Sequence, residues 1–212
     1  MTKVFITTLQ DGKNTSILKY VTDRLVAAFW KPDDIRNEKE ILASAMGHFM
    51  IQQMLLEHGI DRVCLANLSR NTYGKWILPG SSIDFNISHS GNKVVAVLAN
   101  SGVVGIDIEE TTPIRWLEYE DSFSSDEWTL LCRSNEPEKT FFDLWTKKES
   151  LSKAYGFGLQ IPLNKIQVNG RIGIIQGTNL SGHFHPLLIP GYCGHVCSSE
   201  EQEFSVHHFS LP

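Results

Sequence analysis

Apolar and polar residues along this chain repeat with two different periods, one typical of helices and the other typical of strands. After Pro32, apolar residues recur every three to four positions up to Leu56, and Gly59 follows, which predicts an amphipathic helix that the glycine ends. A second long helix is predicted to follow Pro137 and to end at Gly156. The side chains expected along one side of this second helix are Phe141, Leu144, Trp145, Lys148 and Ser152.

A shorter helix is predicted to begin after Ser124. The Ser124 hydroxyl is placed to cap the helix, and Glu127 is placed to reach back to the capping residue. Phe123 precedes the cap and is spaced to pack against Trp128. The segment therefore has the sequence features of a capping box with a hydrophobic staple.

Between the two long helices the period shortens to two. Ile83, Phe85 and Ile87 alternate with Asp84, Asn86 and Ser88, which predicts a strand with one buried face. Turn residues at 90–92 lead to a second predicted strand at 93–99, and those at 100–102 lead to a third at 103–109. Three short strands joined by tight turns predict an antiparallel meander.

The order of these elements bears on the fold class. From Ile161 onward the chain returns to β-like alternation and turns. Helices and hairpins are intermixed without a regular strand–helix alternation, and this favours an α+β fold over a doubly wound sheet.

Composition and charge exclude several classes of protein. The 212 residues carry a net charge of −5, so no general attraction to nucleic acid or to an acidic membrane is expected. Apolar runs such as the one at 94–99 are far too short to span a bilayer, and the N-terminus lacks the features of a signal peptide. Four cysteines in a chain of this length do not indicate a disulfide scaffold. We expect a reduced, cytoplasmic protein.

The segment Cys193-Gly-His195-Val-Cys197 has two interpretations. It could be part of a metal site, but a zinc site needs a fourth ligand and a spacing that lets the chain fold around the ion. The interpretation that we favour is a buried strand of small residues that follows Pro190-Gly191.

Two carboxylates are predicted to share one face of the third strand. Because side chains alternate along a strand, Asp107 and Glu109 project to the same side while Ile106 and Ile108 face the core. Neighbouring carboxylates repel each other unless protons or a cation separate them, and magnesium suits such a pair. The alternative is an exposed strand end with two solvated acids.

Two further segments carry polar groups suited to phosphate chemistry. Glu149 and Lys153 are four residues apart and therefore neighbours on one helix face, where the alternative is a weak surface ion pair. Two glycines follow the lysine and would let the backbone approach a ligand. Ser88, His89 and Ser90 lie at a strand-to-turn corner and can donate hydrogen bonds to phosphate oxygens, although an ordinary hairpin turn has the same composition.

The order and spacing of these segments together resemble the phosphopantetheinyl transferase superfamily. The matching blocks are Phe-Asn-Ile-Ser-His-Ser-Gly at 85–91, Gly-Ile-Asp-Ile-Glu at 105–109 and Trp-Thr-Lys-Lys-Glu-Ser-x-x-Lys-x-x-Gly-x-Gly-Leu at 145–159. Upstream, Gly74-Lys75 resembles the family's Gly-Lys-Pro, with Trp76 in the place of the proline. The length of the chain resembles the monomeric two-lobe class, which includes the enzymes that activate surfactin synthetase.

The resemblance implies an α+β fold of two similar, pseudo-duplicated lobes. Each lobe would be an antiparallel sheet packed with a long helix, and the active site would lie in the cleft between them. We expect an N-terminal lobe at 1–102 on the nucleotide side of coenzyme A, and a C-terminal lobe at 103–212 with the metal and the catalytic residues.

The resemblance also implies a reaction. The family transfers the 4'-phosphopantetheine arm of coenzyme A to a serine of an apo carrier protein of acyl, peptidyl or polyketide type, and adenosine 3',5'-bisphosphate is released. Asp107, Glu109 and Glu149 are expected to hold Mg²⁺, and Glu149 is the candidate that deprotonates the serine. Lys153 is expected to neutralise charge on the phosphates.

The remaining binding roles are also carried over from the family. Ser88 and His89 are expected to hold phosphate oxygens, and Lys75 is expected to lie at the adenosine end of coenzyme A. Two rivals stay open: a magnesium-dependent pyrophosphohydrolase that uses water as nucleophile, and a catalytically silent homologue that binds carrier proteins. Retention of all four charged residues of the expected catalytic set speaks against the silent homologue.

The first predicted helix departs from the family. It lacks the arginines that usually hold the 3'-phosphate, and His48 is its only possible cation between 41 and 53. Lys75, His89, Lys31 and Arg36 are the other candidates in the sequence. We expect a weak grip on this phosphate, partly compensated by Lys75 and His89.

Overall fold

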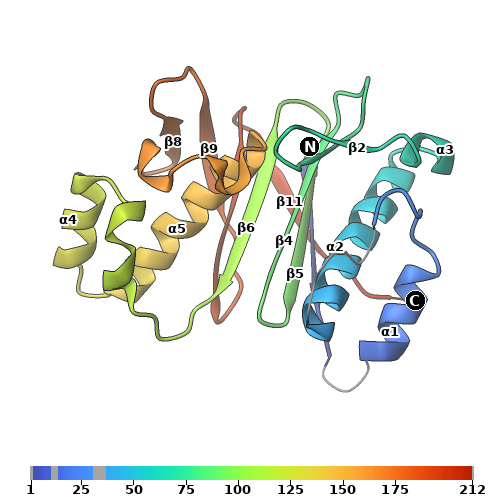
Figure 1. Ribbon diagram of the computed structural model, residues 1–212, viewed down its shortest axis with the longest axis horizontal. Helices are drawn as coiled ribbons and strands as arrows, with labels where there is room; N and C mark the ends of the chain where they lie inside the picture. The colour runs from blue at the N-terminus through green and yellow to red at the C-terminus, as the bar shows by residue number, and fades with distance from the viewer. Residues whose placement is uncertain (1, 11–13, 31–36, 212) are drawn as a thin grey trace.

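A computed structural model describes residues 2–10, 14–30 and 37–211 of the chain. Two β-sheets lie beside each other in the middle of the molecule, with a long helix packed against each (Figure 1). The structure thus confirms the predicted α+β class, with sheets packed against helices.

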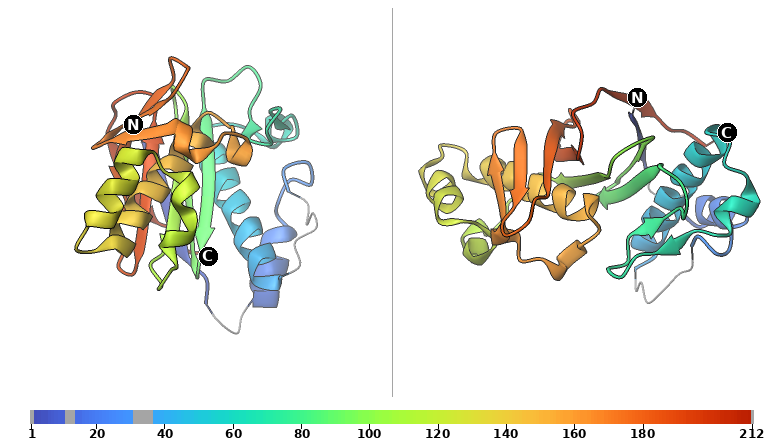
Figure 2. Two further views of the ribbon diagram at one scale, coloured as in Figure 1. Left: turned by 60° about the vertical axis from the view of Figure 1, so that its left-hand side comes forward. Right: turned by 90° about the horizontal axis from the view of Figure 1, so that it is seen from above.

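The first sheet has the strand order β11-β1-β5-β4. Its strands are β1 (Thr2–Thr8), β4 (Asp84–Ser90), β5 (Lys93–Ala99) and β11 (Phe204–His208). Neighbouring strands are antiparallel except β1 and β11, which pair in parallel. Helices α1 (Asn14–Thr22) and α2 (Glu38–Glu57) cover one face of this sheet, where a large apolar cluster forms. Figure 2 shows the C-terminal segment crossing from the second sheet back to β1.

The second sheet has the order β6-β10-β9-β8-β7 and is antiparallel throughout. Its strands are β6 (Val104–Glu110), β7 (Ile166–Asn169), β8 (Ile172–Ile175), β9 (Ser181–Pro186) and β10 (Tyr192–Ser198). Helix α5 (Pro137–Ala154) lies across β6 and β10 and is in turn covered by α4 (Ser125–Arg133) and by η1 (Trp116–Ser122). The short elements are α3 (Arg62–Leu65), the hairpin of β2 (Ser69–Arg70) and β3 (Trp76–Ile77), η2 (Gly158–Gln160) and η3 (Leu163–Lys165).

The predicted helices are found where the apolar spacing places them. Asn37 caps α2 by accepting a hydrogen bond from the Lys39 amide, and the start predicted at Pro32 lies outside the described residues. Pro137 opens α5, as predicted. The capping box between Ser124 and Glu127 is also confirmed, because both of its hydrogen bonds are present. The predicted staple is present too, with the Phe123 and Trp128 rings stacked.

The antiparallel meander predicted from the three central strands is wrong. Strands β4 and β5 form a hairpin, but β6 pairs with β10 and belongs to the second sheet. The reason is that β1 occupies the other edge of β5, so that edge is not free for β6. The third strand instead packs its apolar face against the first sheet, in a cluster of Val4, Ile6, Val95, Val97, Ala99, Val104, Ile106, Ile108, Leu187 and Val196.

Side chains of β4 join the two sheets by accepting hydrogen bonds from backbone amides of β6. The Asp84 carboxylate accepts a hydrogen bond from the Val104 amide at 2.7 Å, and the Asn86 amide oxygen accepts one from the Ile106 amide at 3.2 Å. Ser90 accepts one from the Glu110 amide at 3.0 Å. The polar side chains of β4 therefore supply hydrogen-bond acceptors for three backbone amides of β6.

The Cys193–Cys197 segment forms the middle of β10, which confirms the strand interpretation. The Cys197 side chain is buried, and the thiols of both residues are free. In the described part of the chain, no helix combines the length and the hydropathy needed to cross a membrane.

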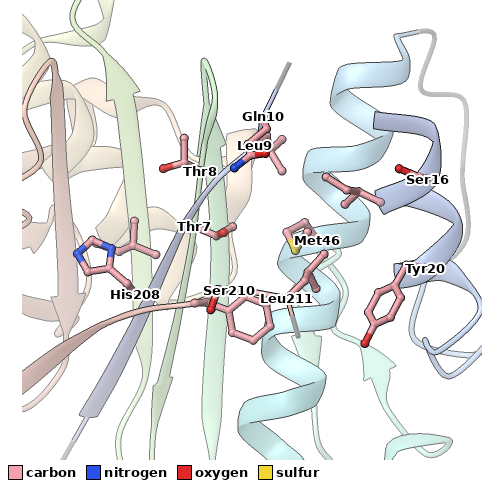
Figure 3. A pocket seen from close by; sticks show the side chains of 13 residues that line it. Thr7, Thr8, Leu9, Gln10, Ser16, Tyr20, Met46, His208, Ser210 and Leu211 are labelled. Carbon is pink, nitrogen blue, oxygen red and sulfur yellow. The ribbon is translucent and has the colours of Figure 1, made fainter. Parts of the chain in front are cut away.

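A pocket of about 560 Å³ lies on the outer side of the first sheet, between the end of β1, α1 and the C-terminal segment (Figure 3). Met46 of α2 and Tyr20 of α1 contribute to its lining, as do His208 and Leu211 near the C-terminus. Its described lining contains no carboxylate, lysine or arginine. The described lining of this pocket therefore supplies none of the carboxylate, lysine or arginine groups that phosphate chemistry uses.

Candidate functional site

A cleft of about 340 Å³ lies where β4, β6 and α5 meet. All the predicted site residues except Lys75 line this cleft. Its lining consists of Ser44, Ile87, Ser88, His89, Asp107, Glu109, Trp145, Glu149 and Lys153. Residues from four separate segments of the sequence, which are α2, β4, β6 and α5, are thus brought to one cavity.

The close packing of α5 on β6 puts the acids and the lysine opposite each other. A Cβ atom at Gly105 would overlap the backbone of Ser150 and of Ala154, so a larger residue there would push the helix away from the strand. Asp107 projects from the side of β6 that faces α5, while Ile106 is fully buried on the other side. The predicted alternation along this strand is therefore confirmed.

Asp107 is the centre of a buried polar contact. Its Oδ1 atom accepts a hydrogen bond from Lys153 Nζ at 2.6 Å and another from the Ser88 hydroxyl at 3.0 Å. Lys153 Nζ also lies 3.1 Å from the Ser88 hydroxyl oxygen. Lys153 thus makes its ion pair with Asp107, across the cleft, and is more than the surface partner of Glu149. The Asp107 Oδ2 atom is buried and has no hydrogen-bond partner in the described part of the chain.

Ser90 holds the second acid of β6. Its hydroxyl donates to Glu109 Oε2 at 2.9 Å while its oxygen accepts from the Glu110 amide. The sequence predicted Ser90 as a donor to phosphate oxygens and not as the partner of Glu109. Its position two residues after Ser88, on the same face of the strand, is the signal that would have identified it.

The charges in the cleft shift each other's pKa values. Burial raises the pKa of Glu109, and repulsion from Asp107 raises it further. Burial also raises the pKa of Glu149, against the opposing effect of Lys153. Burial alone would lower the pKa of Lys153, but attraction to the surrounding acids, Asp107 first, outweighs it and the net shift is upward. The site therefore holds an excess of negative charge that favours a cation.

The donor set of the cleft fits a hard metal ion. In the described part of the chain, no three His, Cys, Asp or Glu side chains already form a cluster spaced to hold a metal. However, Mg²⁺ usually takes one or two carboxylates and completes its shell with water and substrate phosphates. The unpartnered Oδ2 of Asp107 and the nearby carboxylates of Glu109 and Glu149 supply oxygen ligands of this kind.

Lys75 lies outside the cleft, and its ammonium group is engaged within the protein. It donates to Asp84 Oδ2 at 2.5 Å, to the Ala154 carbonyl at 2.7 Å and to the Val104 carbonyl at 3.1 Å. Only 7 % of the side chain is exposed. These bonds use all three donors of the ammonium, so any contact with a ligand would come from the rest of the residue.

A second cavity of about 290 Å³ adjoins the cleft, since Ser44 and Ile87 line both. The stem of Lys75 and the aromatic side chains of Phe29, Trp76 and Phe85 line it. Arg70, which the sequence analysis missed, also lines this cavity, and its guanidinium stacks over the Trp76 ring at 4.6 Å. Arg70 can be identified through the β2–β3 hairpin, because the pairing of these two strands places Arg70 opposite Trp76.

His48 of α2 does not supply a positive charge for the 3'-phosphate. Burial lowers its pKa to about 4, so the imidazole is neutral at physiological pH. Lys31 and Arg36, the other candidates for the 3'-phosphate, lie outside the described residues.

Lys148 is a structural residue beneath the cleft. Its side chain is fully buried, and its ammonium lies 2.7 Å from Glu127 Oε2. It also donates to the carbonyls of Leu163 and Ile166 at 2.9 and 2.6 Å. Burial lowers the pKa of Lys148, and Glu127 opposes this effect. The ion pair links α5 to α4. The two carbonyl contacts link α5 to η3 and to the start of β7.

Comparisons with known proteins agree with this site. The model of the 4'-phosphopantetheinyl transferase superfamily matches residues 103–204, a range that includes Asp107, Glu109, Glu149 and Lys153. The chain is 31 % identical over 167 residues to the 4'-phosphopantetheinyl transferase ffp of Bacillus subtilis, covering 73 % of this chain and 72 % of the relative.

Two more relatives carry the same description. The 4'-phosphopantetheinyl transferase gsp of Aneurinibacillus migulanus is 34 % identical over 171 residues, covering 76 % of this chain and 70 % of the relative. The 4'-phosphopantetheinyl transferase Sfp of Bacillus subtilis strain 168 is 35 % identical over 144 residues, covering 62 % of each chain. The cleft, the family model and these relatives together place the chain in the 4'-phosphopantetheinyl transferase superfamily.

Proposed function

We propose that this protein transfers the 4'-phosphopantetheine arm of coenzyme A to a serine hydroxyl of an apo carrier protein. The observation that supports this most directly is the convergence of Asp107, Glu109, Glu149 and Lys153 on one cleft in a member of this superfamily. The serine oxygen forms a bond to the β-phosphorus of coenzyme A. The bond from that phosphorus to the bridging oxygen breaks, and adenosine 3',5'-bisphosphate leaves.

Each charged residue has a role in this reaction. Asp107, Glu109 and Glu149 would hold Mg²⁺, which when bound neutralises charge on the pyrophosphate oxygens. Glu149 is the candidate that accepts the serine proton, directly or through a water. Lys153 stabilises the negative charge that shifts to the leaving group.

The remaining groups hold the donor. Ser88 and His89 lie at the cleft edge of β4. His89 donates to phosphate oxygens, and the Ser88 hydroxyl does so when it releases Asp107 Oδ1. Lys75 contributes to the nucleotide end through its stem and backbone, because its ammonium is committed elsewhere. Arg70 lies at the same end and supplies the free cation that α2 lacks.

The two sheets are proposed to be the two lobes of the fold, with the boundary near Gly102 and the strand β11 returning to the N-terminal lobe. A monomeric enzyme is proposed, because the chain resembles the monomeric two-lobe class of the superfamily. The carrier protein and coenzyme A are the proposed partners.

The test is intact-mass analysis of several apo carrier proteins incubated with this protein, coenzyme A and Mg²⁺. A carrier that gains one phosphopantetheinyl group supports the proposal. Excess chelator should abolish the gain, added Mg²⁺ should restore it, and Asp107→Ala, Glu109→Ala and Glu149→Ala should abolish it while the fold survives. Release of adenosine 3',5'-bisphosphate without a carrier would indicate a pyrophosphohydrolase, and full activity in chelator would refute the metal assignment.

A further inference from the structure

Two side chains that line the cavity beside the cleft each have a buried polar atom with no hydrogen-bond partner among the described residues. The atoms are Nε2 of His48, on α2, and Nε1 of Trp76, on β3. Their rings lie 6.2 Å apart and are nearly perpendicular, with an interplanar angle of 83°. Buried polar atoms are rarely left without a partner, so two in one cavity call for a ligand or an ordered water.

The hydrogen bond on the other side of the imidazole determines what His48 offers. Nδ1 lies 2.8 Å from the Ser44 carbonyl oxygen, which can only accept, so Nδ1 carries the hydrogen. The ring is neutral because burial lowers its pKa to about 4. Nε2 therefore presents a bare lone pair and can only accept a hydrogen bond.

Trp76 offers the complementary group, since an indole nitrogen can only donate. Its ring is held edge-on to Phe29, at a centroid distance of 5.3 Å, and under the Arg70 guanidinium. One acceptor and one donor thus belong to two side chains that line the same cavity, together with the aromatic residues Phe29 and Phe85. This is the pattern that recognises the edge of a flat heteroaromatic ring with an amino group next to a ring nitrogen.

The cavity is also in the right place for such a ring. It shares Ser44 and Ile87 with the cleft that holds the acids and Lys153. A nucleotide whose phosphates lie in the cleft can therefore place its base in this cavity. Its volume of about 290 Å³ is near the lower end of the range for small-molecule sites, about 300–1,000 Å³.

We propose that His48 and Trp76 together recognise the 6-amino edge of the adenine of coenzyme A by hydrogen bonds. This rests on the proposed function, which supplies coenzyme A as the donor. The 6-amino group donates to His48 Nε2, and the adjacent ring nitrogen, N1 or N7, accepts from Trp76 Nε1. In desamino-coenzyme A, hypoxanthine replaces adenine, and a carbonyl oxygen faces His48, so two acceptors meet.

The experiment compares the dissociation constants of coenzyme A and desamino-coenzyme A by calorimetry, without a carrier protein. The wild type should bind desamino-coenzyme A about tenfold to a hundredfold more weakly, because one buried hydrogen bond is lost and its acceptor is left unpaired. His48→Leu should weaken coenzyme A binding and bring the two constants close to each other. Trp76→Phe should weaken coenzyme A binding about tenfold.

Matched controls separate this role from a general effect of substitution. His58 makes the same contact to the preceding turn, with Nδ1 2.7 Å from the Met54 carbonyl, but does not line the cavity. Trp128 is an indole in the other sheet's helical layer. His58→Leu and Trp128→Phe should leave both constants unchanged. His48→Gln keeps an acceptor and should keep part of the preference, so the test stands even if His48→Leu fails to fold.

Equal affinity of the wild type for the two donors would overturn the proposal, as would a preference that persists in His48→Leu. Either result would mean that these atoms bind only an ordered water. Because binding is measured without a carrier, the result does not depend on transfer. Base preference without transfer to any carrier would count against the proposed function alone.

Discussion

At the scale of single residues, Lys153 is the cation closest to the acids of the cleft. We predict that Lys153→Met lowers kcat about tenfold to a hundredfold and changes KM for coenzyme A less, because one or two charge-assisted hydrogen bonds are lost as the phosphate bond breaks. Lys153→Arg should retain part of the activity. Steady-state kinetics of phosphopantetheine transfer measure the effect.

Lys147→Met is the matched control for this lysine. Lys147 lies on the same helix and pairs with Asp143 at 2.6 Å, away from the cleft lining. Its loss should change kcat little. If kcat is unchanged in Lys153→Met, Lys153 has only a structural role as the partner of Asp107.

A second residue-scale prediction concerns the 3'-phosphate of coenzyme A. Among the groups that line the nucleotide-side cavity, Arg70 has the free guanidinium, while the ammonium of Lys75 is already paired. We predict that the wild type prefers coenzyme A over 3'-dephospho-coenzyme A by about a hundredfold or less, the value of about two charge-assisted hydrogen bonds, in kcat/KM. Arg70→Ala should remove most of this preference.

The control is Arg62→Ala, because Arg62 lies on α3 and does not line the cavity. A preference of about a thousandfold or more in the wild type, an energy of about 4 kcal/mol, would show that the phosphate is firmly held and would contradict the weak grip expected from the first helix. A preference that survives in Arg70→Ala would assign the grip to other groups.

At the scale of elements, α5 depends on the buried pair of Lys148 and Glu127. Removing one partner of a buried ion pair leaves the other charge uncompensated. We predict that Lys148→Met lowers the free energy of unfolding by about 3–5 kcal/mol, measured by urea denaturation. The double variant Lys148→Met/Glu127→Gln should recover part of that loss.

Lys139→Met is the control on the same helix. Lys139 pairs with Glu136 at 3.1 Å, but the two side chains are 75 % and 68 % exposed. An exposed pair contributes about 0–1 kcal/mol, so this variant should stay close to the wild type. Equal losses in Lys139→Met and Lys148→Met would contradict the structural role of the buried pair.

At the scale of the whole molecule, the cleft exists because β4 and β6 lie side by side without forming a backbone ladder. The polar side chains of β4 fill that role, with Asp84 and Asn86 bound to amides of β6. Lys75 adds to this joint by linking Asp84 to the end of α5. The same arrangement turns Ser88 and Ser90 toward Asp107 and Glu109, so the joint between the sheets also positions the acids.

The sequence by itself determined the local elements and the identity of the reactive residues. The capping box at Ser124, the helix after Pro137 and the alternation of Asp107 with Ile106 follow from short-range spacing, because caps and side-chain periodicity depend only on near neighbours. The family resemblance added the reaction, because a combination of three segments is far more specific than any acid pair alone.

Only the tertiary structure decided which distant residues meet. The predicted meander does not form because β1, which is distant in the sequence, occupies the other edge of β5. The apolar pattern of a strand shows which face is buried but not which strand it pairs with. The neutral state of His48, the engagement of Lys75 and the position of Arg70 depend on burial and on contacts between remote segments. Burial and long-range pairing set the charge and availability of each side chain, and these are properties of the folded chain.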